Sequence, residues 1–249
     1  MNVIDAARIT KRFRIPHEKK TTLFETALGY VKNQVTYEDF YALRDVSFTV
    51  KRGETTGLIG KNGSGKTTLL KILGGIIKPT EGAFHLEGVA APLLSLNVGF
   101  HHELTAEENL FLYGAILGIP RKEIREKLRE VLRFAGVERF KDTKLKNFSS
   151  GMTARLAFAM MVQTDPDILL LDEIFAVGDK DFIPQCISVF RDYKRRGKTI
   201  LITSHDTKLI AEHCDKTMLL EDGNLIMFDE TRKVIDYYMN GNGGPHSQL

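Results

Sequence analysis

Cysteine is scarce in this 249-residue sequence, and long uninterrupted apolar runs are absent. The two cysteines, Cys186 and Cys214, lie far apart and lack the spacing of a metal site, so a reduced cytosolic compartment is indicated. The apolar runs are shorter than the roughly 18 residues that a spanning helix needs, which excludes a membrane span but leaves docking on a membrane open. The opening "MNVIDAARITKRF" has no apolar core, so no secretory signal is expected.

The sequence also has no large excess of positive or negative charge. The net charge is only +3 at pH 7, so the composition does not point to a nucleic-acid partner. Hydrophobic residues make up 43% of the chain, which is enough for one domain with a full core and a subdomain.

Predicted strands alternate with predicted helices, which indicates an α/β fold with a parallel sheet. A helical block at about 105–162 looks like an inserted subdomain, and Thr105 and Glu108 form a capping-box pattern near its start. The folded domain is expected to span 1–240, with a flexible tail at 241–249. The stretch 15–37 interrupts the pattern as a short helix or a packed loop. We expect strands within 2–13, 41–54, 55–60, 83–94, 165–174, 198–205 and 215–230. The last of these is expected to be a hairpin with a "DGN" turn. Helices are expected within 66–77, 105–137, 153–162 and 231–239.

The segment "GKNGSGKT" fits the pattern G-x-x-x-x-G-K-[ST] between a buried strand and a helix. Its glycines let backbone N–H groups wrap phosphates, Lys66 supplies a charge for the β- and γ-phosphates, and the Thr67 hydroxyl can ligate Mg²⁺. A glycine-rich turn with an incidental lysine is the alternative, and the flanking strand and helix argue against it. We therefore expect a nucleoside triphosphate site made by Gly60, Asn62, Gly63, Ser64, Gly65, Lys66, Thr67 and Thr68.

Two apolar strands end in side chains that suit hydrolysis. "ILLLDE" places Asp172 where it can hold Mg²⁺ and Glu173 where it can orient or deprotonate the attacking water. "ILITSH" ends in His205, which could contact the γ-phosphate. A solvated acidic pair and a structural histidine are the plainer readings, and the glycine-rich loop upstream favours the catalytic ones.

The segment "NFSSGM" runs directly into the apolar stretch "TARLAFAMMV". It predicts a helix N-terminus with free backbone N–H groups that can hold an anion. No lysine and no metal ligand stand beside it, so by itself it is half of an anion site. Elsewhere, Tyr41 precedes the strand that leads to the glycine-rich loop and could stack on a base, although core packing fits its spacing equally well.

The order of these motifs resembles the ATP-binding subunits of ABC transporters over nearly the whole chain. The resemblance implies an ABC-type nucleotide-binding domain of the P-loop NTPase fold, with an antiparallel β subdomain and an inserted helical subdomain. It also implies a homodimer that closes head-to-tail around two ATP molecules, with Mg²⁺. In such a dimer Ser149 and Gly151, with Ser150 and Met152 at the interface, would hold the γ-phosphate bound on the partner's Lys66.

The remaining correspondences concern single positions. Lys66 and Thr67 match the Walker A pair, and Asp172 and Glu173 match the Walker B aspartate and the catalytic glutamate. His205 matches the switch histidine, and Tyr41 matches the adenine-stacking aromatic. In "AVGD", Asp179 matches the acid of the loop that crosses the dimer interface.

This sequence departs from the family pattern in two places. Its signature reads "FSSGM" where the common form is LSGGQ, and no glutamine occurs between Thr68 and Val162, where the glutamine loop is expected. His101 and His102 are candidates for replacing that glutamine.

These departures narrow the subfamily. The segments "GFHHELTAEENL", "FSSGM.ARLAFA" and "DE.FAVGD..F", together with the early insertion, resemble those of the ATPases that export lipid-linked polysaccharides such as O antigens, capsules and teichoic acids. The resemblance implies ATP-driven export across the inner membrane, with O antigen as the favoured cargo. It also implies that this chain is a peripheral subunit on the cytoplasmic face of that membrane and binds an integral-membrane subunit present in two copies. The stretch Lys19 to Tyr37 is similar to the insertion near the partner's glycan entrance, and the chain is similar to short forms without a carbohydrate-binding domain. Export of another lipid or drug, and a soluble ABC-type ATPase acting on nucleic acid or protein assemblies, are the alternatives.

Overall fold

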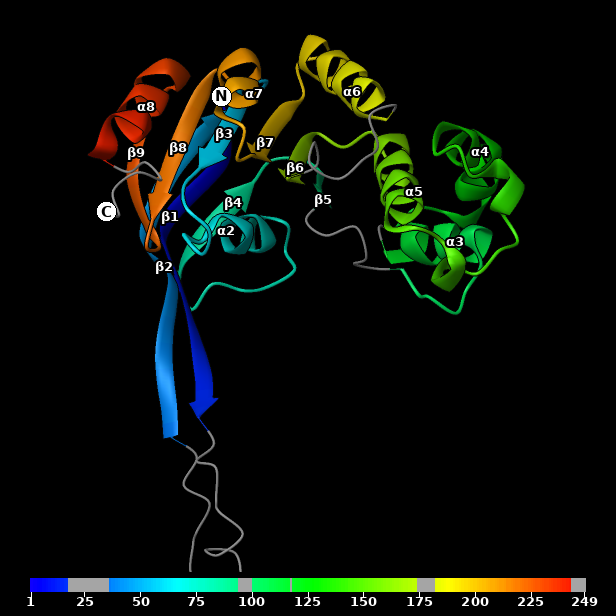
Figure 1. The fold of residues 1–249 in the computed structure, drawn as a ribbon, viewed down its shortest axis with the longest axis horizontal. Helices are drawn as coiled ribbons and strands as arrows, with labels where there is room; N and C mark the ends of the chain where they lie inside the picture. Colours follow the sequence, from blue (N-terminus) through cyan, green and yellow to red (C-terminus); the bar gives the residue numbers. More distant parts are fainter. Residues whose placement is uncertain (18–35, 94–99, 117, 174–181, 243–249) are drawn as a thin grey trace, which may run out of the picture.

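The computed structural model describes residues 1–17, 36–93, 100–116, 118–173 and 182–242 (Figure 1). They form two β-sheets, helices that cover them, and a separate group of helices (Figure 1). Residues 15–17 and 36–37, expected to belong to a short helix or packed loop, are strand instead, because they continue the pairing at the ends of two long strands. Residues 241–242, expected in the flexible tail, end a helical turn. The rest of both features, 18–35 and 243–249, lies outside the described residues.

The larger sheet has six strands in the order β5-β6-β7-β3-β8-β9. Five strands are parallel, and β9 pairs antiparallel with β8. Asp222 and Gly223 join β8 to β9 with φ values of 46° and 81°, the left-handed pair that a tight hairpin turn requires, so the predicted "DGN" turn is confirmed. The strands are β3 (Thr55–Ile59), β5 (Ala90–Leu93), β6 (Ile168–Asp172), β7 (Thr199–Thr203), β8 (Lys216–Glu221) and β9 (Asn224–Glu230).

Both faces of this sheet are buried, as the continuous apolar runs of its parallel strands predict. Leu170 and Leu201 belong to a core shared with the smaller sheet and α2 (Lys66–Leu73). Leu169 and Ile200, one residue away in each strand, belong to a second core. That core is closed by residues of α5 (Ser150–Gln163), α6 (Ile183–Arg195), α7 (Thr207–His213) and α8 (Thr231–Tyr237), after which the chain forms a π-helical turn, η4 (Tyr238–Asn242).

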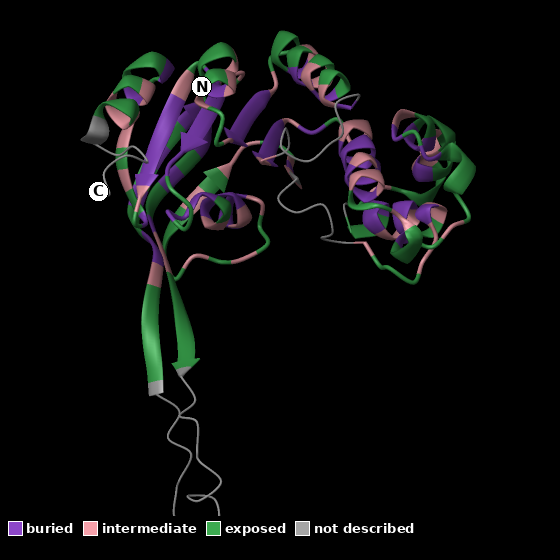
Figure 2. Ribbon diagram, viewed as in Figure 1, coloured by how far each residue is buried: buried purple, intermediate pink, exposed green. Residues whose placement is uncertain are grey.

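The smaller sheet is antiparallel, in the order β2-β1-β4, and comprises β1 (Asn2–His17), β2 (Thr36–Lys51) and β4 (Glu81–Leu86). Its inner half packs on the core, whereas the outer ends of β1 and β2 project from the body as an exposed ribbon (Figures 1 and 2). We call this projection the hairpin arm, residues 11–17 and 36–42. The predicted strands within 83–94 thus belong to different sheets, because β4 pairs with β1 and β5 pairs with β6.

The helical subdomain packs around a core of its own, to the right in Figure 1. It contains α3 (Ala106–Ile116), α4 (Arg121–Phe134), α5 and two short 3-10 turns, η1 (Glu138–Phe140) and η2 (Leu145–Asn147). The predicted capping box is confirmed before α3: the Thr105 N–H donates to Glu108 Oε2 over 2.8 Å, and the Glu108 N–H donates to Thr105 Oγ1 over 3.2 Å.

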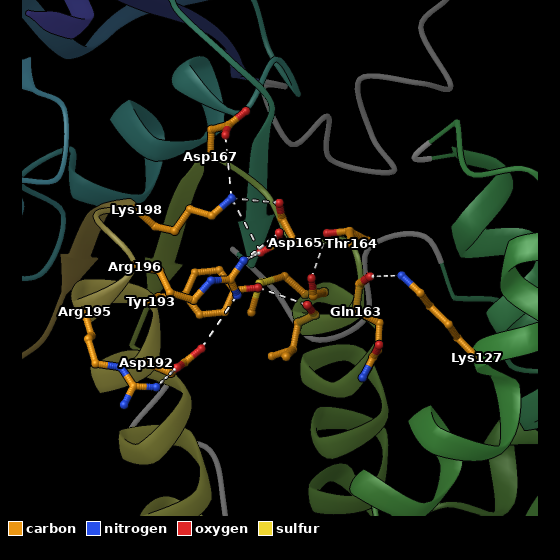
Figure 3. A network of polar contacts seen from close by, with 12 residues as sticks. Lys127, Gln163, Thr164, Asp165, Asp167, Asp192, Tyr193, Arg195, Arg196 and Lys198 are labelled. Carbon is orange, nitrogen blue, oxygen red and sulfur yellow. Dashed lines mark hydrogen bonds and ion pairs between the residues drawn. The ribbon is translucent and has the colours of Figure 1, made fainter.

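A polar network fastens the end of α5 to the larger sheet and to α6 (Figure 3). The buried Tyr193 of α6 donates its hydroxyl to the Val162 carbonyl over 3.0 Å. Arg196 donates to Asp165 over 2.6 Å, and Lys198 donates to the Asp165 carbonyl over 3.2 Å. The C-terminal end of α5 is therefore tied to the segment that leads into β7.

Within the described part of the chain, every helix is too short or too polar to cross a lipid bilayer.

Candidate functional site

The glycine-rich loop joins the end of β3 to the start of α2, as its sequence predicts. Gly60 has φ 143°, and a Cβ there would lie 2.1 Å from the Leu220 carbonyl oxygen. Gly65 has φ 106°, and its Cβ would lie 2.4 Å from the Ala42 carbonyl oxygen. Because a side chain at either position would strike backbone, the path of this loop depends on glycine.

Lys66 is the buried cation of the loop, with 6% of its surface exposed. Its ammonium donates to the carbonyls of Gly60 and Lys61 over 2.8 and 2.9 Å, which fixes the side chain along the loop. Burial lowers the pKa of Lys66 from its usual value, while the carboxylates of Glu173 and Asp172 act in the opposite direction. The Lys66 ammonium is thus already fixed where a phosphate anion would bind.

Asp172 lies at the C-terminal end of β6, and both of its carboxylate oxygens are hydrogen-bonded. Thr67 Oγ1 donates to Oδ2 over 2.8 Å, and Thr203 Oγ1 donates to Oδ1 over 2.6 Å. The first contact joins the two predicted metal ligands across 105 residues of sequence. A hydroxyl and a carboxylate beside a phosphate loop suit Mg²⁺, which prefers oxygen ligands and takes most of its coordination from phosphates and water.

Glu173 follows directly, with φ 52°, a left-handed backbone conformation that is rare outside glycine. Its N–H donates to Thr203 Oγ1 over 3.0 Å and to the Thr203 carbonyl over 3.2 Å. His205 Nε2 lies 2.6 Å from Glu173 Oε1, so the structure brings these two predicted residues together. Backbone strain of this kind collects at functional sites, where the surroundings hold it in place.

A cavity of about 220 Å³ opens above the loop. Two aromatic side chains of the hairpin arm, Phe13 and Phe40, form one wall, and they face each other across β1 and β2. The other lining residues are Ala42, Asn62, Gly63, Ser64, Gly65, Lys66, Thr67, Thr68 and Glu173. Ser64 Oγ is buried there and has no hydrogen-bond partner among the described residues.

The prediction of Tyr41 as the base-stacking residue is not supported by this geometry. Tyr41 is not among the lining residues of the cavity, and the Arg44 guanidinium covers its ring at 4.5 Å. Successive side chains of a strand point to opposite faces, so Phe40 and Ala42 face the loop and Tyr41 faces away. Phe13 was missed, although it is the aromatic residue that ends the predicted opening strand.

The predicted anion site lies elsewhere, at the start of α5 in the helical subdomain (Figure 1). Ser149 caps the helix by accepting the Met152 N–H over 3.2 Å. Ser149 and Ser150 are exposed, Gly151 is half-buried, and Met152 is half-buried against the core of the subdomain. None of these residues lines the cavity, so within one chain the two halves of the expected site remain apart.

Two predictions fall on residues that are not described. Asp179 and the "AVGD" segment lie within 174–181, and residues 94–99, part of the stretch where a glutamine loop is expected, are not described either. Nearby, His101 and His102 are exposed, and the His101 N–H donates to the buried Asn109 side chain over 2.6 Å.

Comparison with known proteins also indicates an ATP-binding protein. The sequence pattern of the family described as "ABC transporter" matches residues 43–176. The O-antigen export system ATP-binding protein RfbB of Klebsiella pneumoniae is 38% identical over 95% of this chain and 97% of its own length. The teichoic acids export ATP-binding protein TagH of Staphylococcus saprophyticus is 37% identical over 96% of this chain and 89% of its own.

Solved structures give the same fold. The post-hydrolysis dimer of the ATP-binding cassette MJ0796, bound to ADP and phosphate, superimposes with a TM-score of 0.72 at 24% identity over 92% of this chain and 99% of that one. The predicted fold class is confirmed, and this chain belongs to the ABC transporter family as an ATP-binding subunit.

Proposed function

We propose that this chain hydrolyses ATP to drive export of a lipid-linked polysaccharide across the inner membrane, through an integral-membrane partner present in two copies. O antigen is the favoured cargo, and teichoic acid, capsule or another lipid are the alternatives. The proposal is supported by relatives named for O-antigen and teichoic-acid export that align with nearly the whole chain.

The mechanism is supported by one observation: none of the residues at the N-terminus of α5 lines the cavity of the same chain. We propose that two copies close head-to-tail, so that Ser149 and Gly151 of one meet the γ-phosphate held on Lys66 of the other. The free N–H groups and the positive end of the helix dipole favour that anion. This arrangement explains why α5 has neither a lysine nor a metal ligand at its start.

Residues in and beside the cavity then have separate parts in hydrolysis. Phe13 and Phe40 offer rings to the base, and the loop with Lys66 holds the triphosphate. Thr67 and Asp172 would hold Mg²⁺, which when bound offsets the phosphate charge. Glu173 orients the attacking water and accepts its proton, while His205 fixes the Glu173 carboxylate and lies ready to contact the γ-phosphate.

The helical subdomain offers the surface that would receive the membrane partner. In the apolar segment 110–119, Leu110 and Tyr113 are buried, but Ile116 is 60% exposed at the end of α3. An exposed apolar residue at the end of a helix whose inner face is buried suits a docking contact. A subunit docked in this way would lie peripherally on the cytoplasmic face of the membrane.

The test is made in cells that produce this chain with its membrane partner. Glu173→Gln should leave long lipid-linked glycan inside and remove it from the surface, and the composition of the trapped glycan would distinguish O antigen from teichoic acid. Glu212→Gln makes the same chemical change on the exposed face of α7 and should export normally. Normal surface glycan in the Glu173 variant would refute polysaccharide export.

A further inference from the structure

We infer that Thr203 is a positioning residue for the ATPase reaction, because its one hydroxyl holds both acids of the site in place. The inference rests on the proposed roles of Asp172 and Glu173. It adds to them the group that fixes their relative position.

Thr203 is the last residue of β7 and is fully buried. It lies directly beside Asp172 in the parallel register of β6 and β7. Its hydroxyl donates to Asp172 Oδ1 over 2.6 Å and accepts from the Glu173 N–H over 3.0 Å. A backbone N–H can only donate, so the single hydroxyl proton is left for the carboxylate.

The bond to Asp172 completes a pair of contacts, because Thr67 holds the other oxygen over 2.8 Å. The carboxylate is thereby fixed from the glycine-rich loop on one side and from β7 on the other. Partners that orient a metal ligand in this way strongly affect metal affinity. Asp172 itself is half-buried, and loss of the Thr203 hydroxyl would leave its Oδ1 without this donor.

The bond to Glu173 acts on the second acid. Its backbone has φ 52°, and Thr203 receives its N–H at both the hydroxyl and the carbonyl oxygen. A left-handed glutamate persists only where neighbouring groups hold it. Thr203 therefore fixes the backbone turn that presents the Glu173 side chain to His205 and to the cavity.

The same strand provides a matched control. Thr199 is also buried, at the opposite end of β7, and its hydroxyl accepts the Gly53 N–H over 3.0 Å, away from the site. Thr199→Val and Thr203→Val thus remove equivalent hydroxyls from one strand. Thr203→Ser keeps the hydroxyl and removes only a methyl group.

The experiment measures Mn²⁺ binding by electron paramagnetic resonance in the presence of ATPγS, together with metal-free affinity for a fluorescent ATP analogue and steady-state kcat. Thr203→Val should weaken Mn²⁺ binding and lower kcat by about 10- to 100-fold, as loss of a group that orients a metal ligand does. Metal-free nucleotide affinity should stay within about twofold, because neither Lys66 nor the aromatic wall is altered. Thr203→Ser should recover both losses, and Thr199→Val should change thermal stability alone.

Unchanged Mn²⁺ affinity in Thr203→Val would overturn the inference, as would equal losses in Thr203→Val and Thr199→Val. Failure of the unmodified protein to bind Mn²⁺ with ATPγS would instead refute the proposed metal site.

Discussion

His205 Nε2 lies 2.6 Å from Glu173 Oε1, so the proposed catalytic carboxylate and the histidine at the end of the neighbouring strand are in direct contact. Both side chains are half-exposed, at 50% for His205 and 41% for Glu173. Removal of the Glu173 charge should preserve this geometry and stop proton acceptance from water.

We therefore expect Glu173→Gln to accumulate as a closed dimer at saturating Mg-ATP, since hydrolysis normally reopens it. Multi-angle light scattering should find about twice the mass of the nucleotide-free variant. His205→Ala, which loses the contact with the Glu173 carboxylate, should hydrolyse ATP slowly and accumulate the closed dimer to a smaller extent. A monomeric Glu173→Gln under these conditions would contradict the pairing of two half-sites.

Lys66→Ala should weaken ATP binding by about 10- to 100-fold, because a charge-assisted hydrogen bond contributes roughly 1.5–3 kcal/mol. Lys71→Ala removes the same charge farther along α2, away from the cavity, and should bind normally. Isothermal titration calorimetry measures the ATP affinity of both variants. Equal affinities of the Lys66 variant and the unmodified protein would remove Lys66 from the nucleotide site.

The aromatic wall predicts a contrast between neighbouring residues. Phe13→Ala or Phe40→Ala should each weaken binding of ATP, since stacking on one base contributes about 1–3 kcal/mol. Tyr41→Ala should leave affinity unchanged, because its side chain does not line the cavity. Fluorescent-nucleotide titration of the three variants tests the assignment, and the reverse ranking would restore Tyr41 as the base platform.

Ser149 has two separable roles, as helix cap and as part of the second half-site. Ser149→Ala should lower the free energy of unfolding by about 1 kcal/mol through loss of the cap. Ser149→Asp keeps a capping oxygen but brings a negative charge toward the phosphate, so its stability should be retained while the ATP-dependent dimer is lost. Thermal unfolding and light scattering separate these effects, and a stable Ser149→Asp dimer would contradict the proposed contact.

Alkaline pH should destabilise the fold through its buried thiols. Burial raises the pKa of Cys186 and of Cys214 to about 12, from an ordinary value of 9.0. A raised pKa in the folded state means that stability is intact below pH 9 and declines as pH rises toward 12. Melting curves across this range should show a smaller decline in a Cys186→Ala/Cys214→Ala double variant, and both thiols should resist disulfide reagents at pH 8 until the chain unfolds. Rapid native labelling would contradict their burial.

Features that depend on local chemistry were predictable from the sequence. The glycine-rich loop, the capping box before α3 and the Asp222-Gly223 turn each require particular residues at fixed spacings, and the structure has all three. Both buried strands that end at the site, β6 and β7, were predicted from their continuous apolar runs. Two helices, α6 and α7, were not predicted, although the sequence carries signals for both. Cys186, Phe190 and Tyr193 of α6 recur at helical spacing, and Asp206 caps α7.

Other features depend on pairings between distant residues. The separation of β4 from β5 is set by the partners β1 and β6, which lie far away in sequence. That Phe13 and Phe40 line the cavity and Tyr41 does not depends on the register of a long hairpin. Thr203 looked like one more residue of a buried strand, because its bonds to Asp172 and Glu173 cross about 30 positions of sequence.

The register of the hairpin arm also restricts how this chain can evolve. Phe13 and Phe40 are opposite each other, and β1 and β2 continue in step from there to His17 and Thr36. A single insertion between either ring and the body of the sheet would turn that ring to the opposite face and remove it from the cavity. The described pairing of the arm ends at His17 and Thr36. For the aromatic wall of the cavity to persist, the number of residues between each ring and the body of the sheet must therefore stay fixed.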